Sequence, residues 1–107
     1  MTRSADDGSI ITRAQALTMI QGFQKSAAFQ GIKGGFYGRN NLLKILNQPN
    51  CVGIRYYYGK NDKNEPVIVL VGEDNKGKCM SDDVVLELWP YCPPWCPESN
   101  ALDAKPA

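Results

Sequence analysis

Apolar residues recur at three- and four-residue spacings soon after the start of the chain, the pattern of one helix face. Thr12 precedes this pattern, and Gln15 lies three residues after Thr12, as in a capping box. The sequence therefore predicts a helix from Arg13 to Phe29. Its apolar face contains Ala16, Leu17, Ile20, Phe23 and Ala27.

A second helical pattern follows a glycine-rich connection, in which Gly31, Gly34, Gly35 and Gly38 interrupt regular structure. Asn40 or Asn41 is the expected N-cap, and Gln48 with Pro49 is the expected stop. We expect a short helix that is buried on at least one side. Its apolar residues are Leu42, Leu43, Ile45 and Leu46.

The residue types then become typical of strands. Two-residue alternation from Cys51 places Val52, Ile54, Tyr56 and Tyr58 on one face, which we expect to point toward the core. Cys51, Gly53, Arg55 and Tyr57 fall on the other face. A polar stretch over 59–66 predicts a hairpin, and the unbroken apolar run Val67–Val71 predicts a strand buried on both faces.

The last part of the chain is less regular. Asp74–Gly77 is a turn signal, and 84–89 is either a third strand or a short amphipathic segment. The fold class is α+β, with two N-terminal helices packed on a small antiparallel three-stranded meander and an extended proline-rich tail. We expect a flexible arm over 1–11, one domain over 12–97 and a flexible tail over 98–107.

The amino-acid composition excludes several classes of catalytic and metal-binding site. A length of 107 residues with 43% hydrophobic content suits one compact domain. Histidine is absent, which excludes Ser/His/Asp catalysis and His-ligated zinc. The acidic pairs Glu73–Asp74 and Asp82–Asp83 are adjacent in or beside turns, and we interpret them as solvated turn charges rather than as an acid/base dyad. No enzymatic activity and no cofactor are therefore expected.

The expected compartment is the cytoplasm. The first ten residues lack the apolar core of a secretory signal. The longest apolar run, Val67–Val71, is far shorter than the roughly 20 residues that cross a bilayer. No membrane partner is expected.

Charge is divided along the chain. Residues 8–61 hold seven basic and no acidic residues (+7), residues 62–107 hold four basic and nine acidic residues (−5), and residues 1–7 add −1. The basic half suits phosphate, nucleic acid or an acidic protein. Alternatively, the two halves neutralise each other within one fold.

The segment Lys33–Arg39 is the best candidate for anion binding. Its glycines allow backbone N–H groups to converge just before a helix N-terminus. The candidate residues are Lys33, Gly34, Gly35, Arg39 and Lys44. The alternative is a plain connection that places Phe36 and Tyr37 in the core.

Three consecutive tyrosines, Tyr56–Tyr58, follow Arg55 and resemble a strip on which nucleic-acid bases stack. Alternation weighs against this interpretation, because it directs Tyr56 and Tyr58 toward the core.

The segment Cys92–Cys96 reads Cys-Pro-Pro-Trp-Cys. Its cysteines could form a redox-active or regulatory disulfide, could bind zinc together with Cys79 and Cys51, or could simply pack. The prolines stiffen a tail that would present Trp89, Tyr91 and Trp95 to a partner.

Three stretches, Leu42–Arg55, Val69–Gly72 and Cys92–Cys96, resemble a group of uncharacterised small bacterial proteins. The resemblance covers about residues 34–102. It implies that the helix, the hairpin and the tail belong to one unit, and it implies no activity, substrate or cofactor.

The sequence favours a non-enzymatic protein-interaction or accessory module, as a homo-oligomer or with a larger protein. Its contact surface would be the aromatic tail or an exposed edge of the sheet. The alternatives are an anion- or nucleic-acid-binding module and a thiol-redox or zinc-stabilised protein.

Overall fold

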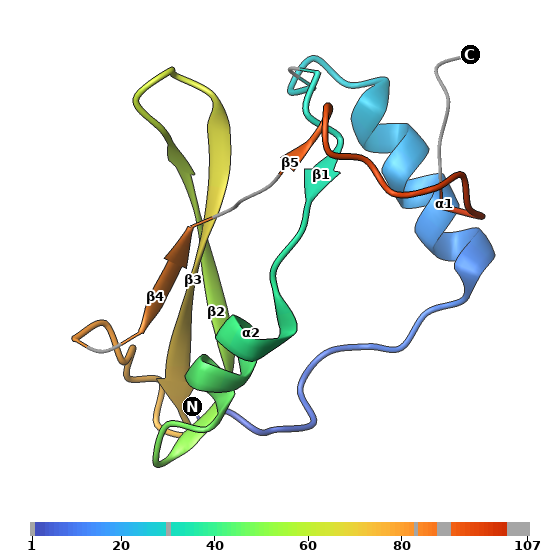
Figure 1. The fold of residues 1–107 in the computed structure, drawn as a ribbon. Coiled ribbons are helices and arrows are strands. Elements are labelled where there is room, and N and C mark those ends of the chain that lie inside the picture. Colours follow the sequence, from blue (N-terminus) through green and yellow to red (C-terminus); the bar gives the residue numbers. More distant parts are fainter. Residues whose placement is uncertain (1, 30, 83, 88–90, 103–107) are drawn as a thin grey trace. The chain divides into compact units, whose positions relative to one another are not determined.

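The computed structural model describes residues 2–29, 31–82, 84–87 and 91–102. The chain divides into two compact units, drawn in Figure 1. We call them the sheet unit, Met1–Asp7 with Phe36–Pro90, and the tail unit, Gly8–Gly35 with Tyr91–Ala107. The arrangement of 12–97 as one domain stays a prediction.

The sheet unit contains a three-stranded antiparallel sheet in the order β2-β3-β4. Its strands are β2 (Cys51–Lys60), β3 (Pro66–Asp74) and β4 (Val85–Glu87). This confirms the α+β class and the meander, and it identifies the described part of 84–89 as a strand. The rest of that segment, including Trp89, lies outside the described residues.

The central strand β3 holds most of the core. Val67, Leu70 and Val71 are buried, as the apolar run predicts. A strand with neighbours on both edges and a helix over one face has little surface left for water, which explains why apolar residues follow one another without alternation.

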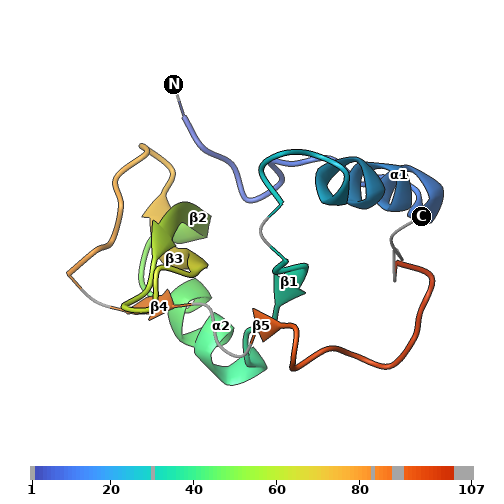
Figure 2. The same cartoon turned by 90° about the horizontal axis from the view of Figure 1, so that it is seen from above.

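Helix α2 (Arg39–Leu46) packs on β2 and β3, beside the sheet in Figure 2. Ile45 is fully buried, as expected for the inner side of this helix. The expected N-cap at Asn40 or Asn41 is wrong: Gly38 is the N-cap, and its carbonyl accepts the first helical bond from the Leu42 N–H. Glycine is accepted at this position because its backbone is extended there.

Gly72 of β3 allows α2 to approach the sheet closely. A Cβ atom at this position would lie 2.8 Å from Gln48 Nε2, 3.1 Å from Cys51 Sγ and 3.3 Å from Ile45 Cγ2. The first of these atoms is the far end of a flexible side chain, whereas Cys51 Sγ and Ile45 Cγ2 lie closer than ordinary packing contacts. A side chain here would therefore press on the end of α2 and the start of β2.

Helix α1 (Arg13–Gln24) belongs to the tail unit. It begins where predicted, and its capping box is complete, with Gln15 N–H donating to Thr12 Oγ1 and Thr12 N–H donating to Gln15 Oε1. The predicted end at Phe29 is wrong. The Ser26 hydroxyl donates to the Phe23 carbonyl at 2.6 Å, a local bond that competes with the helix ladder.

The apolar face predicted for α1 is only partly covered. Ala16, Leu17 and Ile20 are half-buried, whereas Phe23 is 48% exposed and contacts Phe29 edge to face. The packing of this helix on the sheet stays a prediction.

The tail unit also has a two-stranded antiparallel sheet. Its strands are β1 (Gly34–Gly35) and β5 (Tyr91–Cys92), with Gly34 opposite Cys92. The tail is thus partly paired. In the described portion of the chain, no helix has the length and hydrophobicity needed to cross a membrane.

Candidate functional site

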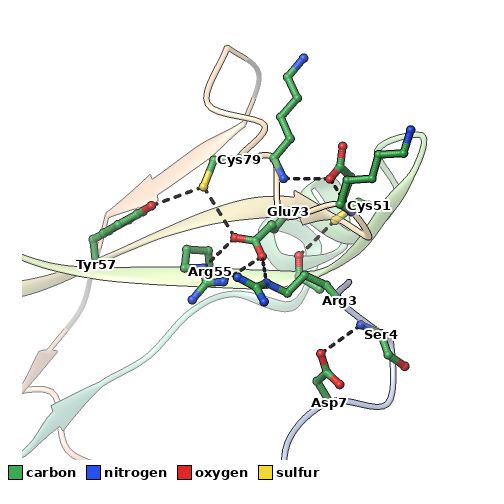
Figure 3. A network of polar contacts seen from close by, with 12 residues as sticks. Arg3, Ser4, Asp7, Cys51, Arg55, Tyr57, Glu73 and Cys79 are labelled. Atoms are coloured by element: carbon green, nitrogen blue, oxygen red, sulfur yellow. Dashed lines mark hydrogen bonds and ion pairs between the residues drawn. The ribbon is translucent and has the colours of Figure 1, made fainter. Parts of the chain in front are cut away.

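A buried carboxylate organises one end of the sheet unit. Glu73 of β3 is only 5% exposed, and it accepts hydrogen bonds from two arginines (Figure 3). Arg55 Nε and Nη2 donate to its two oxygens at 2.7 and 2.8 Å, and Arg3 Nε donates to Oε2 at 2.8 Å. Such charge-assisted, two-pronged contacts fix the side chains in one orientation.

These contacts hold Glu73 in its charged form. Hydrogen bonds from Arg55, then from Arg3, lower the pKa of Glu73 from 4.5 to about 2, and burial opposes them. The same pair raises the pKa of Arg55. Glu73 is therefore a structural anion at neutral pH and has no proton to give or accept there.

Arg3 connects the start of the chain to the sheet. Its backbone N–H also donates to the Asn75 carbonyl at 2.6 Å. Ser4 N–H donates to Asp7 Oδ2 at 3.0 Å, which closes a turn in the segment that the sequence predicts as a flexible arm. A hollow of about 430 Å³ lies between this segment and the start of β2, lined by Arg3, Asp7, Gly53, Ile54 and Arg55 among others.

Cys79 extends the cluster on the other side of Glu73. Its sulfur lies 3.4 Å from Tyr57 Oη and 3.7 Å from Glu73 Oε1. The hydrogen bond with Cys79 raises the pKa of Tyr57. Arg55 and Tyr57 thus share one face of β2, as the alternation predicts.

The other face of β2 contradicts the expectation that Tyr56 and Tyr58 are in the core. Their exposed fractions are 56% and 81%, and their rings meet edge to face with centroids 5.7 Å apart. Tyr57 is 53% exposed. Helix α2 packs on β2 and β3 but leaves these rings exposed.

The backbone of β2 also has an outer edge, because β2 lies at one side of the sheet. In an antiparallel pair, each residue points its N–H and C=O either toward the partner strand or away from it, in alternation. Three contacts show in which direction backbone groups of β3 point. Gly72 O accepts from Met80 N–H, Asp74 N–H donates to Lys78 O, and Ile68 O accepts from Tyr37 Oη. All three groups are thus committed on the side away from β2.

The residues opposite Gly72, Leu70 and Ile68 are Ile54, Tyr56 and Tyr58. Their N–H and C=O groups must then point away from β3, and we call this row the outer edge of β2. No backbone hydrogen bond joins these positions to any described segment beyond the sheet. An unpaired row of this kind is a template for another strand.

The predicted anion-binding residues are divided between the units. Lys33, Gly34 and Gly35 lie in the tail unit, and Arg39 and Lys44 lie on α2 of the sheet unit. The Lys33 N–H donates to the Cys92 carbonyl at 2.7 Å, and neither Gly34 nor Gly35 has a positive φ. The backbone of 33–35 is therefore used in strand pairing and does not form the converging N–H groups of an anion nest.

Cys92 and Cys96 form a disulfide, with Cα atoms 4.7 Å apart. Cys92 is buried and Cys96 is exposed. Both sulfurs are used in this bond, and no cluster of three or more metal-ligating side chains exists among the described residues. Trp95, inside the loop, is 62% exposed, while Trp89 and the side chain of Tyr91 lie outside the description.

Two parts of this site are not predicted from the sequence. The interpretation of Glu73 and Asp74 as solvated turn charges is right for Asp74, whose Oδ1 accepts the Lys76 and Lys78 N–H groups, but wrong for Glu73. Arg3 is not among the residues that the sequence singles out. The available signal was that Glu73 continues the buried run of β3 and follows Gly72 directly.

Comparisons with known proteins identify no relative: no family model, no curated protein and no solved structure matches the chain.

Proposed function

We propose that this chain is a non-enzymatic protein-interaction module that binds an extended segment of a protein by adding it as a strand to the outer edge of β2. The observation that carries the proposal is the unpaired row of backbone groups at Ile54, Tyr56 and Tyr58. Main-chain hydrogen bonds supply affinity in this mode of recognition, and side chains beside the edge supply specificity.

The side chains around the edge support this function. Tyrosine is enriched at protein interfaces because a rigid ring buries much area while its hydroxyl keeps a polar contact. Tyr56 and Tyr58 contact each other edge to face, so the apolar surface that a partner would cover is gathered in one place.

Natural sheets commonly protect their edges with proline, bulges or inward-facing charges, and most edge strands are short. β2 has ten residues, and its irregularity lies between Cys51 and Gly53, near one end. Arg55 is bound to Glu73 and does not stand as an isolated charge on the edge. The middle of β2 therefore remains open to pairing.

The exposed tyrosines are also compatible with single-stranded nucleic acid as a ligand, because bases stack on such rings. The two ligands need different atoms of Tyr56. Strand addition needs the backbone N–H, whereas base stacking needs the ring.

Two variants of Tyr56 separate these ligands. Tyr56→Pro removes the ring and the outward N–H, but it costs no bond to β3, so the fold should tolerate it at an edge position. Tyr56→Thr, the matched control, removes the ring and keeps both the N–H and the strand propensity.

We expect recovery of proteins from a cell extract to fall modestly with Tyr56→Thr, which loses only the contacts of the ring. With Tyr56→Pro it should fall about a further tenfold, since a backbone hydrogen bond to the partner is also lost. Circular dichroism verifies that both variants are folded. Equal recovery by all three proteins would contradict strand addition. Oligonucleotide binding that is lost equally in both variants would instead favour nucleic acid.

A further inference from the structure

We propose that a second copy of this chain is the partner that occupies the outer edge of β2, by antiparallel pairing of the two β2 strands about a two-fold axis. This inference rests on the proposed function and names the occupant. A two-fold contact uses the same surface on both copies, so the surface must be complementary to itself. The sequence of β2 meets that condition in one register.

Only some registers are allowed. In an antiparallel pair, two opposed residues direct their backbone N–H and C=O groups either both toward the other strand or both away from it. Residues whose backbone groups point away from β3 must therefore oppose residues of the same kind in the second copy. The backbone N–H and C=O groups of Ile54, Tyr56 and Tyr58 point away from β3, and those of Arg55 and Tyr57 point toward β3. The two longest symmetric pairings within β2 are therefore one that centres on Arg55 and one that centres on Tyr56.

Charge distinguishes these two registers. Centring on Arg55 places the two arginines directly opposite each other. Like charges in direct opposition destabilise a sheet. Centring on Tyr56 instead places Arg55 opposite Tyr57 of the second copy, and the guanidinium group that Glu73 holds can then lie over a tyrosine ring.

The register centred on Tyr56 also gathers the exposed rings. Tyr56 lies opposite its own copy, and Ile54 lies opposite Tyr58, so all of these side chains share one face of the joined sheet. Their cross-strand contacts cover tyrosines that are 56% and 81% exposed in the single chain.

Regular pairing in this register runs from Ile54 to Tyr58. Val52, which would oppose Lys60 of the second copy, is the extra residue of the irregularity between Cys51 and Gly53.

Cysteine cross-linking tests the register. In the proposed dimer, Tyr56→Cys places two cysteines at a directly opposed pair with Cα atoms about 5.5 Å apart, which suits a disulfide. Tyr58→Cys, the matched control, places them about 14 Å apart along the strands. After mild oxidation, peptide mapping should find the 56–56 link several-fold above the 58–58 link. Mapping also separates it from links through Cys51 and Cys79.

The oligomeric state tests the partner. Analytical ultracentrifugation should give the wild-type chain twice its mass of 11.8 kDa as concentration rises, and Tyr56→Pro should remain at 11.8 kDa. A wild-type chain that stays monomeric up to about 1 mM, or equal cross-linking at 56 and 58, overturns the second copy as partner. If Tyr56→Pro then still abolishes recovery of another protein and Tyr56→Thr does not, strand addition itself stands.

Discussion

At the scale of single residues, the sheet unit depends on a small residue at one position and a charged residue at another. Gly72 lets the end of α2 approach β3, and Glu73, next in sequence, is the buried anion that two arginines share. The two residues are neighbours on opposite faces of the strand. Gly72 therefore determines how closely α2 packs, and Glu73 supplies the negative charge that binds Arg3 and Arg55.

Gly72→Ala should destabilise the chain by about 1–3 kcal/mol, because the new methyl group overpacks the contact with Gln48, Cys51 and Ile45. Gly59→Ala is the matched control, since its methyl group would meet only Val67 at an ordinary 3.5 Å. Denaturant unfolding measures both. Equal free energies of unfolding for the two variants would show that α2 does not pack tightly over Gly72.

The stability that Glu73 provides should depend on pH in one direction. Its pKa is lowered from 4.5 to about 2 in the folded chain, so its contribution is complete above 4.5 and is lost as pH falls toward 2. We expect the difference in free energy of unfolding between wild type and Glu73→Gln to shrink across this range. A difference that stays constant between pH 7 and pH 2 would contradict the ion pairs.

At the scale of elements, sequence patterns predicted those parts that local chemistry decides. The capping box placed the start of α1, the apolar run identified β3, and the Asp74–Gly77 turn formed as expected, with Gly77 at a φ of +87°. The end of α1 escaped prediction because one hydroxyl, that of Ser26, binds a helix carbonyl. Propensity rules do not register a single competing bond of this kind.

The tyrosine face of β2 shows a different limit of sequence reasoning. Alternation correctly divided the strand into two faces, since Tyr56 and Tyr58 share one and Arg55 and Tyr57 share the other. It could not say which face is covered, because that depends on where distant elements pack. The outer edge was equally invisible, since its direction follows from bonds made by Met80, Lys78 and Tyr37.

At the scale of the whole molecule, the chain combines the sheet unit, in which β2 lies at one edge of the sheet, with the tail unit, in which a disulfide closes the short loop Cys92–Cys96. Disulfides are typical of oxidising compartments, whereas the sequence predicts the cytoplasm. The compartment therefore stays a prediction. The proposed interaction uses only the sheet unit and does not depend on the redox state of Cys92 and Cys96.

Residue-resolved amide hydrogen exchange of the full chain tests the open edge of β2 most directly. In dilute solution, the amides of Ile54, Tyr56 and Tyr58 should exchange quickly, while those of Arg55 and Tyr57 should be protected by β3. At concentrations where the chain associates, the first three should become protected by about tenfold or more. Protection of Ile54, Tyr56 and Tyr58 equal to that of Arg55 and Tyr57 in the dilute monomer would contradict an open edge.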